Sequence, residues 1–228
     1  MKHFLLVIVF IALFLGIRYR GISVSMPNSF CLMSDEVLSV ESKSLIYEQL
    51  ITCAQKKNSL QETIDSLKTA FSYIKNVSIS YHPQQCKVYV VAQKPVGLIN
   101  NFLVLTDKKN LFEKSIFFEK KVCHVPSFLI ENDMISQAAN IVIPLLNTLP
   151  ESVYTTYDIH IKDKDTIVFT DKSDSFFNII LSLDQRSSKK LFTLCETVKH
   201  SIMTEKNYKN FLWSADTRFA HYIIAYKT

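Results

Sequence analysis

The sequence contains very little glycine, three residues in a chain of 228. A loop that wraps around a phosphate group needs several glycines close together, because their missing Cβ atoms let the backbone approach the ligand. Neither a P-loop nor a dinucleotide-binding glycine motif is present. The shortage therefore excludes the commonest motifs of nucleotide-dependent enzymes.

Motifs for metal binding and nucleophilic catalysis are missing as well. The six histidines include no pair four residues apart and no HExxH motif, and no serine stands in a GxSxG motif. We therefore expect no enzyme activity, no metal and no other cofactor. The five cysteines are widely spaced, without a CxxC pair, and most are expected in the core, while disulfide pairing stays open. They are Cys31, Cys53, Cys86, Cys123 and Cys195.

A basic surface for nucleic acid is also absent. Lysine and arginine exceed aspartate and glutamate by five, but they are scattered in short runs and form no stripe. Nucleic acid is therefore not an expected partner. Nearly half of the residues (48%) are apolar, which is enough for one or two folded domains.

One long apolar run is present, from Phe4 to Ile17 within residues 1–20. As a helix it would measure about 21 Å, against roughly 30 Å for the hydrocarbon core of a bilayer. It could be a cleaved secretory signal or a short membrane anchor, and both readings stay open. The bulky and cationic residues that follow, Arg18 to Arg20, are poor context for cleavage, so we expect an anchor. The N-terminus would then be cytoplasmic and residues 21–228 extracytoplasmic.

The next segments predict a compact module. Residues 21–34, with several serines, are expected to be a connector, and residues 35–40 a strand. A first helix has apolar spacing over 45–53, and a second begins at a capping box of Ser59 and Glu62 and continues at helical period to residue 74. Residues 77–81 and 88–91 alternate and are separated by a proline turn, which predicts a hairpin. The predicted order is strand, helix, helix, strand, strand.

This order and the hairpin residues resemble the membrane-proximal module of the bacterial cell-division family FtsQ/DivIB, a module of the POTRA class. The resemblance covers "YIKNVSISYHPQQCKVYVVAQKPVGLI", then "FLVLTDKKNLFEK" and "VPSF". Three places depart from the family pattern. Tyr81-His82 replaces an arginine, Gln93-Lys94 replaces Glu-Arg, and Asn110 stands where a turn glycine is usual. Asparagine tolerates a left-handed backbone, so we expect the turn to keep its conformation at Asn110.

The second half of the chain extends the pattern. Helices are predicted over 135–149 and 187–203, and strands near 153–162, 165–170 and 176–183, with aspartates in the turns. The closing stretch is similar to the family's terminal signature, with Asp216, Arg218 and Phe219 at matching positions. The aromatic residues Phe176, Phe177, Phe211 and Trp213 are expected in the core.

Together these features predict an α+β protein with a single N-terminal transmembrane helix. Residues 1–20 would be the anchor, 21–34 a connector, 35–100 a POTRA-like domain, and 101–228 an antiparallel β-domain with flanking helices.

The resemblance implies a non-catalytic, single-pass scaffold of the bacterial divisome, in the cell inner membrane at the division septum. It implies that FtsB and FtsL dock on the β-domain, and that the POTRA-like domain contacts FtsW and FtsI. The alternatives are a POTRA-containing component of outer-membrane protein assembly or secretion, and a secreted α+β domain of another kind. The first alternative is less favoured, because such proteins usually carry several modules or a following barrel.

The residues themselves point to one docking surface. Residues 217–226 predict a terminal strand, and a strand that ends a chain is expected at a sheet edge, where its backbone can pair with a strand of FtsB. The residues expected to bind the partner are Arg218, Phe219, Ala220, His221, Tyr222, Ile223 and Ile224.

Overall fold

The computed structural model describes residues 25–27, 29–82, 85–173, 176–182, 188–204, 211–218 and 223–227. These residues form two units, one ending at Asp35 and resuming over Glu41–Ala92, the other made of Glu36–Val40 and Gln93–Thr228. Both units combine helices with a sheet, which confirms the α+β class. The predicted anchor lies outside the described residues. Among those that are described, no helix has the length and apolar character needed to cross a membrane.

The first unit contains the predicted order of strand, helix, helix, strand, strand. Its strands form a three-stranded sheet in the order β1-β3-β2, with β1 parallel and β2 antiparallel to β3. The elements are β1 (Phe30–Ser34), α2 (Val40–Gln55), α3 (Leu60–Ala70), β2 (Ile74–His82) and β3 (Gln85–Ala92).

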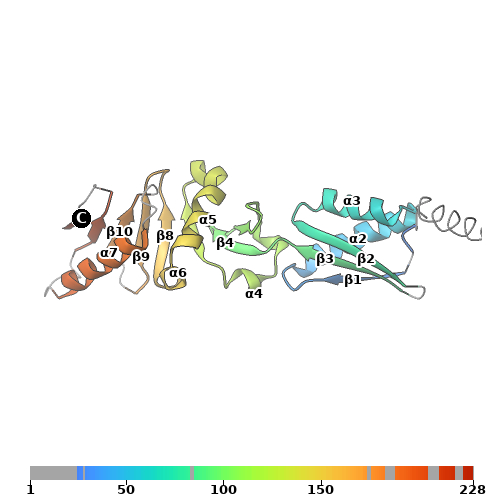
Figure 1. The fold of residues 1–228 in the computed structure, drawn as a ribbon, viewed down its shortest axis with the longest axis horizontal. Coiled ribbons are helices and arrows are strands. Elements are labelled where there is room, and N and C mark those ends of the chain that lie inside the picture. The colour runs from blue at the N-terminus through green and yellow to red at the C-terminus, as the bar shows by residue number, and fades with distance from the viewer. Residues whose placement is uncertain are drawn as a thin grey trace, which may run out of the picture. The chain divides into compact units, whose positions relative to one another are not determined.

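Alternation along β3 decides which face of this sheet is covered. Val88 and Val90 are buried, whereas Tyr89 and Val91 are exposed, so one face carries the apolar core. Helices α2 and α3 lie against the sheet (Figure 1). The predicted capping box starts α3: the N–H of Glu62 donates to Ser59 Oγ at 3.2 Å, and the N–H of Ser59 donates to Glu62 Oε2 at 2.6 Å.

The start of the first unit differs from the sequence prediction. Residues 30–34, assigned to a connector, form β1, and Met26 is buried. Residues 35–40 are not a strand, because the Asp35 carboxylate accepts a hydrogen bond from the N–H of Ala92 (3.0 Å) and the chain turns there. Residues 36–40 belong to the second unit, where Leu38 forms an isolated antiparallel bridge with Phe117.

The second unit is built on a nine-stranded sheet in the order β12-β11-β10-β9-β8-β7-β4-β5-β6. The prediction of an antiparallel domain is wrong in part, because β7 is parallel to β4 and β8, and β11 is parallel to β10. Parallel neighbours need a long crossover, and helices supply it between β7 and β8 and between β10 and β11. The strands are β4 (Pro95–Ile99), β5 (Leu103–Thr106), β6 (Leu111–Glu113), β7 (Ser127–Ile130), β8 (Tyr157–Ile161), β9 (Ile167–Asp171), β10 (Phe177–Leu181), β11 (Trp213–Asp216) and β12 (Ile224–Lys227).

The helices of the second unit match the predicted ranges only in part. The helix predicted over 135–149 is a 3₁₀ helix followed by an α-helix, and the predicted strand 153–162 begins only at Tyr157, after a short helix. The helices are η1 (Lys114–Ile116), α4 (Glu119–Val122), η2 (Asn132–Gln137), α5 (Ala138–Thr148), α6 (Glu151–Thr156) and α7 (Ser188–Met203).

Helix α7 lies along β9 and β10 (Figure 1), where the rings of Tyr157, Phe169 and Phe192 pack edge to face. Cys195 on α7 is fully buried in this core, and its burial raises the pKa of the thiol to about 12. The prediction that most cysteines lie in cores is confirmed for Cys53, Cys86 and Cys195.

Candidate partner-binding edge of the second unit

Strand β12 lies at one end of the nine-stranded order and pairs with β11 alone among the described strands. The predicted continuous strand over 217–226 is wrong, because Thr217, Arg218 and Ile223 are not in a strand. Phe219, Ala220, His221 and Tyr222 lie outside the described residues. The chain instead forms β11, leaves the sheet after Asp216 and returns as β12.

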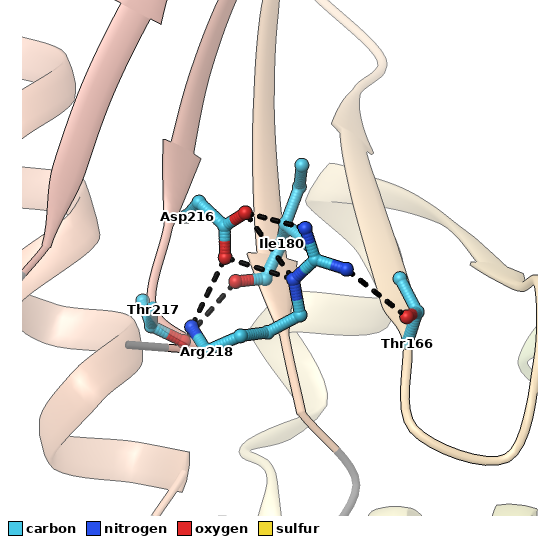
Figure 2. Close-up of polar contacts among 5 residues, drawn as sticks. All are labelled: Thr166, Ile180, Asp216, Thr217 and Arg218. Atoms are coloured by element: carbon cyan, nitrogen blue, oxygen red, sulfur yellow. Dashed lines mark hydrogen bonds and ion pairs between the residues drawn. The ribbon is translucent and has the colours of Figure 1, made fainter. Parts of the chain in front are cut away.

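A fork between Asp216 and Arg218 explains why the chain leaves the sheet at this point (Figure 2). Arg218 Nη2 donates to Asp216 Oδ2 at 2.6 Å, and Nε donates to Oδ1 at 3.0 Å. The backbone N–H of Arg218 also donates to Asp216 Oδ1 at 3.0 Å. An aspartate that accepts from the N–H two residues later turns the backbone, so the ladder cannot continue through Arg218.

Two further contacts tie this turn to the neighbouring strands. Arg218 Nη1 donates to Thr166 Oγ1 at 3.4 Å, just before β9, and the N–H of Thr217 donates to the carbonyl of Ile180 in β10 at 3.0 Å (Figure 2). The turn after β11 is therefore bonded to β10 and to the residue just before β9. Arg218, predicted to contact a partner, has these partners within its own chain, and contact with another protein stays a prediction.

The fork also sets the charge state of Asp216, whose side chain is 2% exposed, against 41% for Arg218. Burial by itself raises the pKa of the Asp216 carboxyl, but the hydrogen bonds and the positive charge of Arg218 outweigh it and lower that pKa below its ordinary value. Asp216 is therefore an ionised carboxylate inside the sheet at neutral pH.

Backbone directions in β11 follow from its bonds to the β10 side. The N–H of Trp213 donates to the carbonyl of Phe176, just before β10, at 2.7 Å, and the N–H of Thr217 donates to the carbonyl of Ile180 in β10 at 3.0 Å. Backbone groups alternate in direction along a strand, so the groups of Ser214 and Asp216 point to β12.

The same reasoning identifies which backbone groups of β12 point away from β11. Tyr226 and Ile224 stand opposite Ser214 and Asp216, so each pair exchanges its hydrogen bonds across the ladder. Ala225 and Lys227 therefore direct their N–H and C=O groups away from β11, to the outer edge. The sequence did not single out these two residues as donors, because which alternate set faces outward depends on the register.

Side chains around the edge leave apolar surface exposed. Ile224 is 42% exposed, and Phe211 and Leu212, just before β11, are 42% and 38% exposed. The ammonium of Lys227 lies 4.5 Å from the centre of the Phe211 ring and 4.7 Å from that of Trp213. Trp213 and Phe177 are in the core as predicted, whereas Phe176 and Phe211 are exposed and that part of the prediction is wrong.

Near β4 and β5, far from β12 in the strand order, Gln93 has a structural role. Gln93 is buried, and its side-chain oxygen accepts hydrogen bonds from Thr106 Oγ1 (2.7 Å) and Asn110 Nδ2 (3.1 Å). The left-handed residue of this turn is Lys109, with φ of 65°, and not Asn110 as expected. Asn110 contributes its side-chain donor, and its carbonyl accepts a hydrogen bond from the N–H of Thr106 at 3.0 Å.

Within the described residues, no three or more histidine, cysteine, aspartate or glutamate side chains come together as a set that could hold a metal ion.

No protein-family model matches the chain, and no curated protein matches it.

Proposed function

We propose that this chain is a non-catalytic, membrane-anchored scaffold of the bacterial divisome, with residues 21–228 outside the cytoplasm. Its second unit binds FtsB and FtsL at the β12 edge, and its first unit contacts FtsW and FtsI. The proposal comes from the ordered motifs of the FtsQ/DivIB family in the sequence. The observation that carries it is the outward direction of the Ala225 and Lys227 backbone groups at the end of the sheet.

An edge strand supports strand addition because its outer N–H and C=O groups match those of a second strand. Exposed Ile224, Phe211 and Leu212 lie beside these groups and would cover apolar side chains of the added strand. The edge is short, so the backbone ladder needs this apolar surface to bind firmly.

The test replaces outward and inward residues of β12 with proline. Ala225→Pro removes an outward N–H, and we expect binding of the FtsB–FtsL extracytoplasmic segments, measured by calorimetry on the full chain, to weaken about tenfold. The melting temperature should change little, because proline is tolerated on the outer side of an edge strand. Ala225→Val keeps the N–H and should bind normally.

Tyr226→Pro provides the contrasting variant, since it removes an inward ladder bond and should lower the melting temperature. If Ala225→Pro remains folded and binds as well as Ala225→Val, edge pairing is wrong.

Membrane placement is tested separately. Carbonate extraction should leave the intact protein in the membrane fraction, and recovery of a soluble form trimmed near residue 25 would contradict the anchor.

A further inference from the structure

The second unit contains a pocket of about 630 Å³ that lies away from the β12 edge. Its apolar lining comes from the start of β4, from the loop before β7 and from α5, and it includes Pro95, Val96, Val125, Ile143 and Leu146. Pro95 is buried and the other four are half-buried, so the pocket offers a partly sheltered apolar surface. Ligand sites in proteins commonly measure about 300–1,000 Å³.

Three motifs that lie apart in the sequence meet at this pocket. Lys94-Pro95 follows the hairpin of the first unit in the chain, Asp107 belongs to the next turn, and Val125-Pro126 precedes β7. The N–H of Lys94 donates to Asp107 Oδ1 at 2.9 Å, and the N–H of Asp107 donates to the carbonyl of Lys94 at 2.8 Å. These bonds fix the backbone of Lys94 beside the pocket.

The rim of the pocket is more basic than acidic. Lys94, Lys121 and His124 line it, against the single carboxylate of Asp107. Lys121 lies 3.1 Å from Glu36, an ion pair in which both side chains are well exposed and therefore weak. Among the described residues, no ion pair involves Lys94 or His124. The Lys94 ammonium is therefore available to an anion bound in the pocket.

The backbone around the pocket is already paired, which argues against an added peptide strand. The N–H of Leu98 donates to the carbonyl of Pro126 at 2.8 Å, the Lys94 and Asp107 groups bond each other, and Pro95 has no N–H. A peptide that gains affinity from main-chain hydrogen bonds would find few partners here. A small molecule with an apolar body needs none of them.

We infer that this pocket binds a monomeric, single-chain anionic amphiphile, with its apolar chain between β4 and α5 and its carboxylate or phosphate head group at Lys94. The proposal is independent of the β12 edge and of the divisome assignment. Its occupant follows from the Lys94 ammonium, the apolar lining and the volume of the pocket.

Calorimetric titration of the full chain tests the inference with decanoate and decyl phosphate below their micelle concentrations. At least one of the two anions should bind at one site, and their comparison identifies the preferred head group. Decanol, with the same chain and no charge, should bind at least about fivefold more weakly, and acetate should show no binding.

Two matched pairs of variants place the site. Asn147 lies on the pocket wall and is exposed, so Asn147→Phe should fill the cavity and weaken binding at least about tenfold. Asn140→Phe, on the same helix and outside the lining, should bind as the wild type. Lys94→Gln should weaken binding of the anion about fivefold and leave decanol unchanged, whereas Lys108→Gln should change neither.

Several results would overturn the inference. A failure of both anions to bind would overturn it. Equal binding of decanol and decanoate would do so as well, and so would equal binding to Asn147→Phe and Asn140→Phe. Binding to anionic phosphatidylglycerol vesicles that is the same in both asparagine variants, without binding of the monomeric anions, would indicate a membrane surface contact elsewhere on the chain.

Discussion

Asp216 is a buried carboxylate whose charge is balanced by a guanidinium two residues later, and this local pair decides where β11 ends. Its pKa is lower in the folded protein than its ordinary value. A group of this kind stabilises the fold above its ordinary pKa, and the stabilisation is lost as the pH falls through the folded pKa. Acid should therefore weaken the second unit through this residue.

We expect Asp216→Asn to lower the free energy of unfolding at neutral pH by about 1–3 kcal/mol, since it removes a charged acceptor of several hydrogen bonds. The wild type should lose part of its stability below about pH 4, and the variant should lose less over that range. Urea unfolding at several pH values measures both effects. Asp133→Asn, at an exposed residue of η2, is the control. Parallel pH profiles of wild type and Asp216→Asn would contradict the assignment.

A second charged pair is buried between α7 and the sheet. The ammonium of Lys199 contacts the carboxylate of Asp171, and these residues are only 8% and 1% exposed. Asp171 also accepts hydrogen bonds from the N–H and hydroxyl of Ser173, at 2.7 and 2.6 Å. Removing the ammonium alone leaves a buried negative charge without its main partner.

Lys199→Met should therefore destabilise the protein by about 3–5 kcal/mol, measured by the midpoint of urea unfolding. The double variant Asp171→Asn with Lys199→Met should recover part of the loss, because it removes the uncompensated charge. Additive losses in the double variant would show that the pair does not act as a unit.

Among the elements, α3 shows how a local signal fixes a boundary. The capping box of Ser59 and Glu62 satisfies two backbone donors at the start of the helix, and the carboxylate of Glu62 has a lowered pKa because of its bonds to Ser59. The helix ends at Ala70, although the apolar spacing continues to Ile74, because Ile74 begins β2. Pairing with β3 decides the end, and the cap decides the beginning.

Ser59→Ala should lower the free energy of unfolding by about 1 kcal/mol through loss of the cap. Ser44→Ala, at an exposed position inside α2, should leave stability unchanged or raise it slightly, since alanine is the better helix former. Chemical denaturation followed by circular dichroism compares the two. An equal effect of both substitutions would show that the cap contributes nothing to stability.

For the whole molecule, the division into two units does not follow the order of the chain. Residues 36–40 come before α2, yet they belong to the second unit, where Leu38 is 1% exposed and pairs with Phe117. The N–H of Phe118 also donates to the carbonyl of Val37 at 2.7 Å. A change in this early segment should therefore affect a unit whose remaining sequence begins at residue 93.

Leu38→Ala should destabilise the second unit by about 2–5 kcal/mol, because it leaves a cavity beside Phe117. Hydrogen exchange should become faster in β5 and should remain unchanged in β3. Leu45→Ala, at an exposed leucine of α2, is the control and should change neither strand. Faster exchange in β3 alone after Leu38→Ala would place the segment with the first unit instead.

Much of the fold follows from the sequence because its signals are local. Alternation marked β3, the capping box marked the start of α3, and turn-forming aspartates marked the end of β8: the N–H of Asp165 donates to Asp163 Oδ1 at 2.8 Å. Each signal acts over a few residues, so tertiary contacts do not change it. The α+β class and the two helices and hairpin of the first unit needed no more than this, whereas its first strand was predicted at 35–40 and lies at Phe30–Ser34.

Partners distant in the sequence decided the remainder. Residues 217–226 have the composition of one strand, but the contacts of Arg218 with Asp216 and Thr166 end β11 there. Parallel pairing of β4, β7 and β8 depends on which strands become neighbours after the helices have packed, and composition does not encode this. The outward direction of Ala225 likewise depends on the register against β11. The sequence by itself determined most of the helices and the hairpin of β2 and β3, because propensity and periodicity are local. Only the tertiary structure decided the edge and the pocket, because both are made by backbone and side chains that meet after folding.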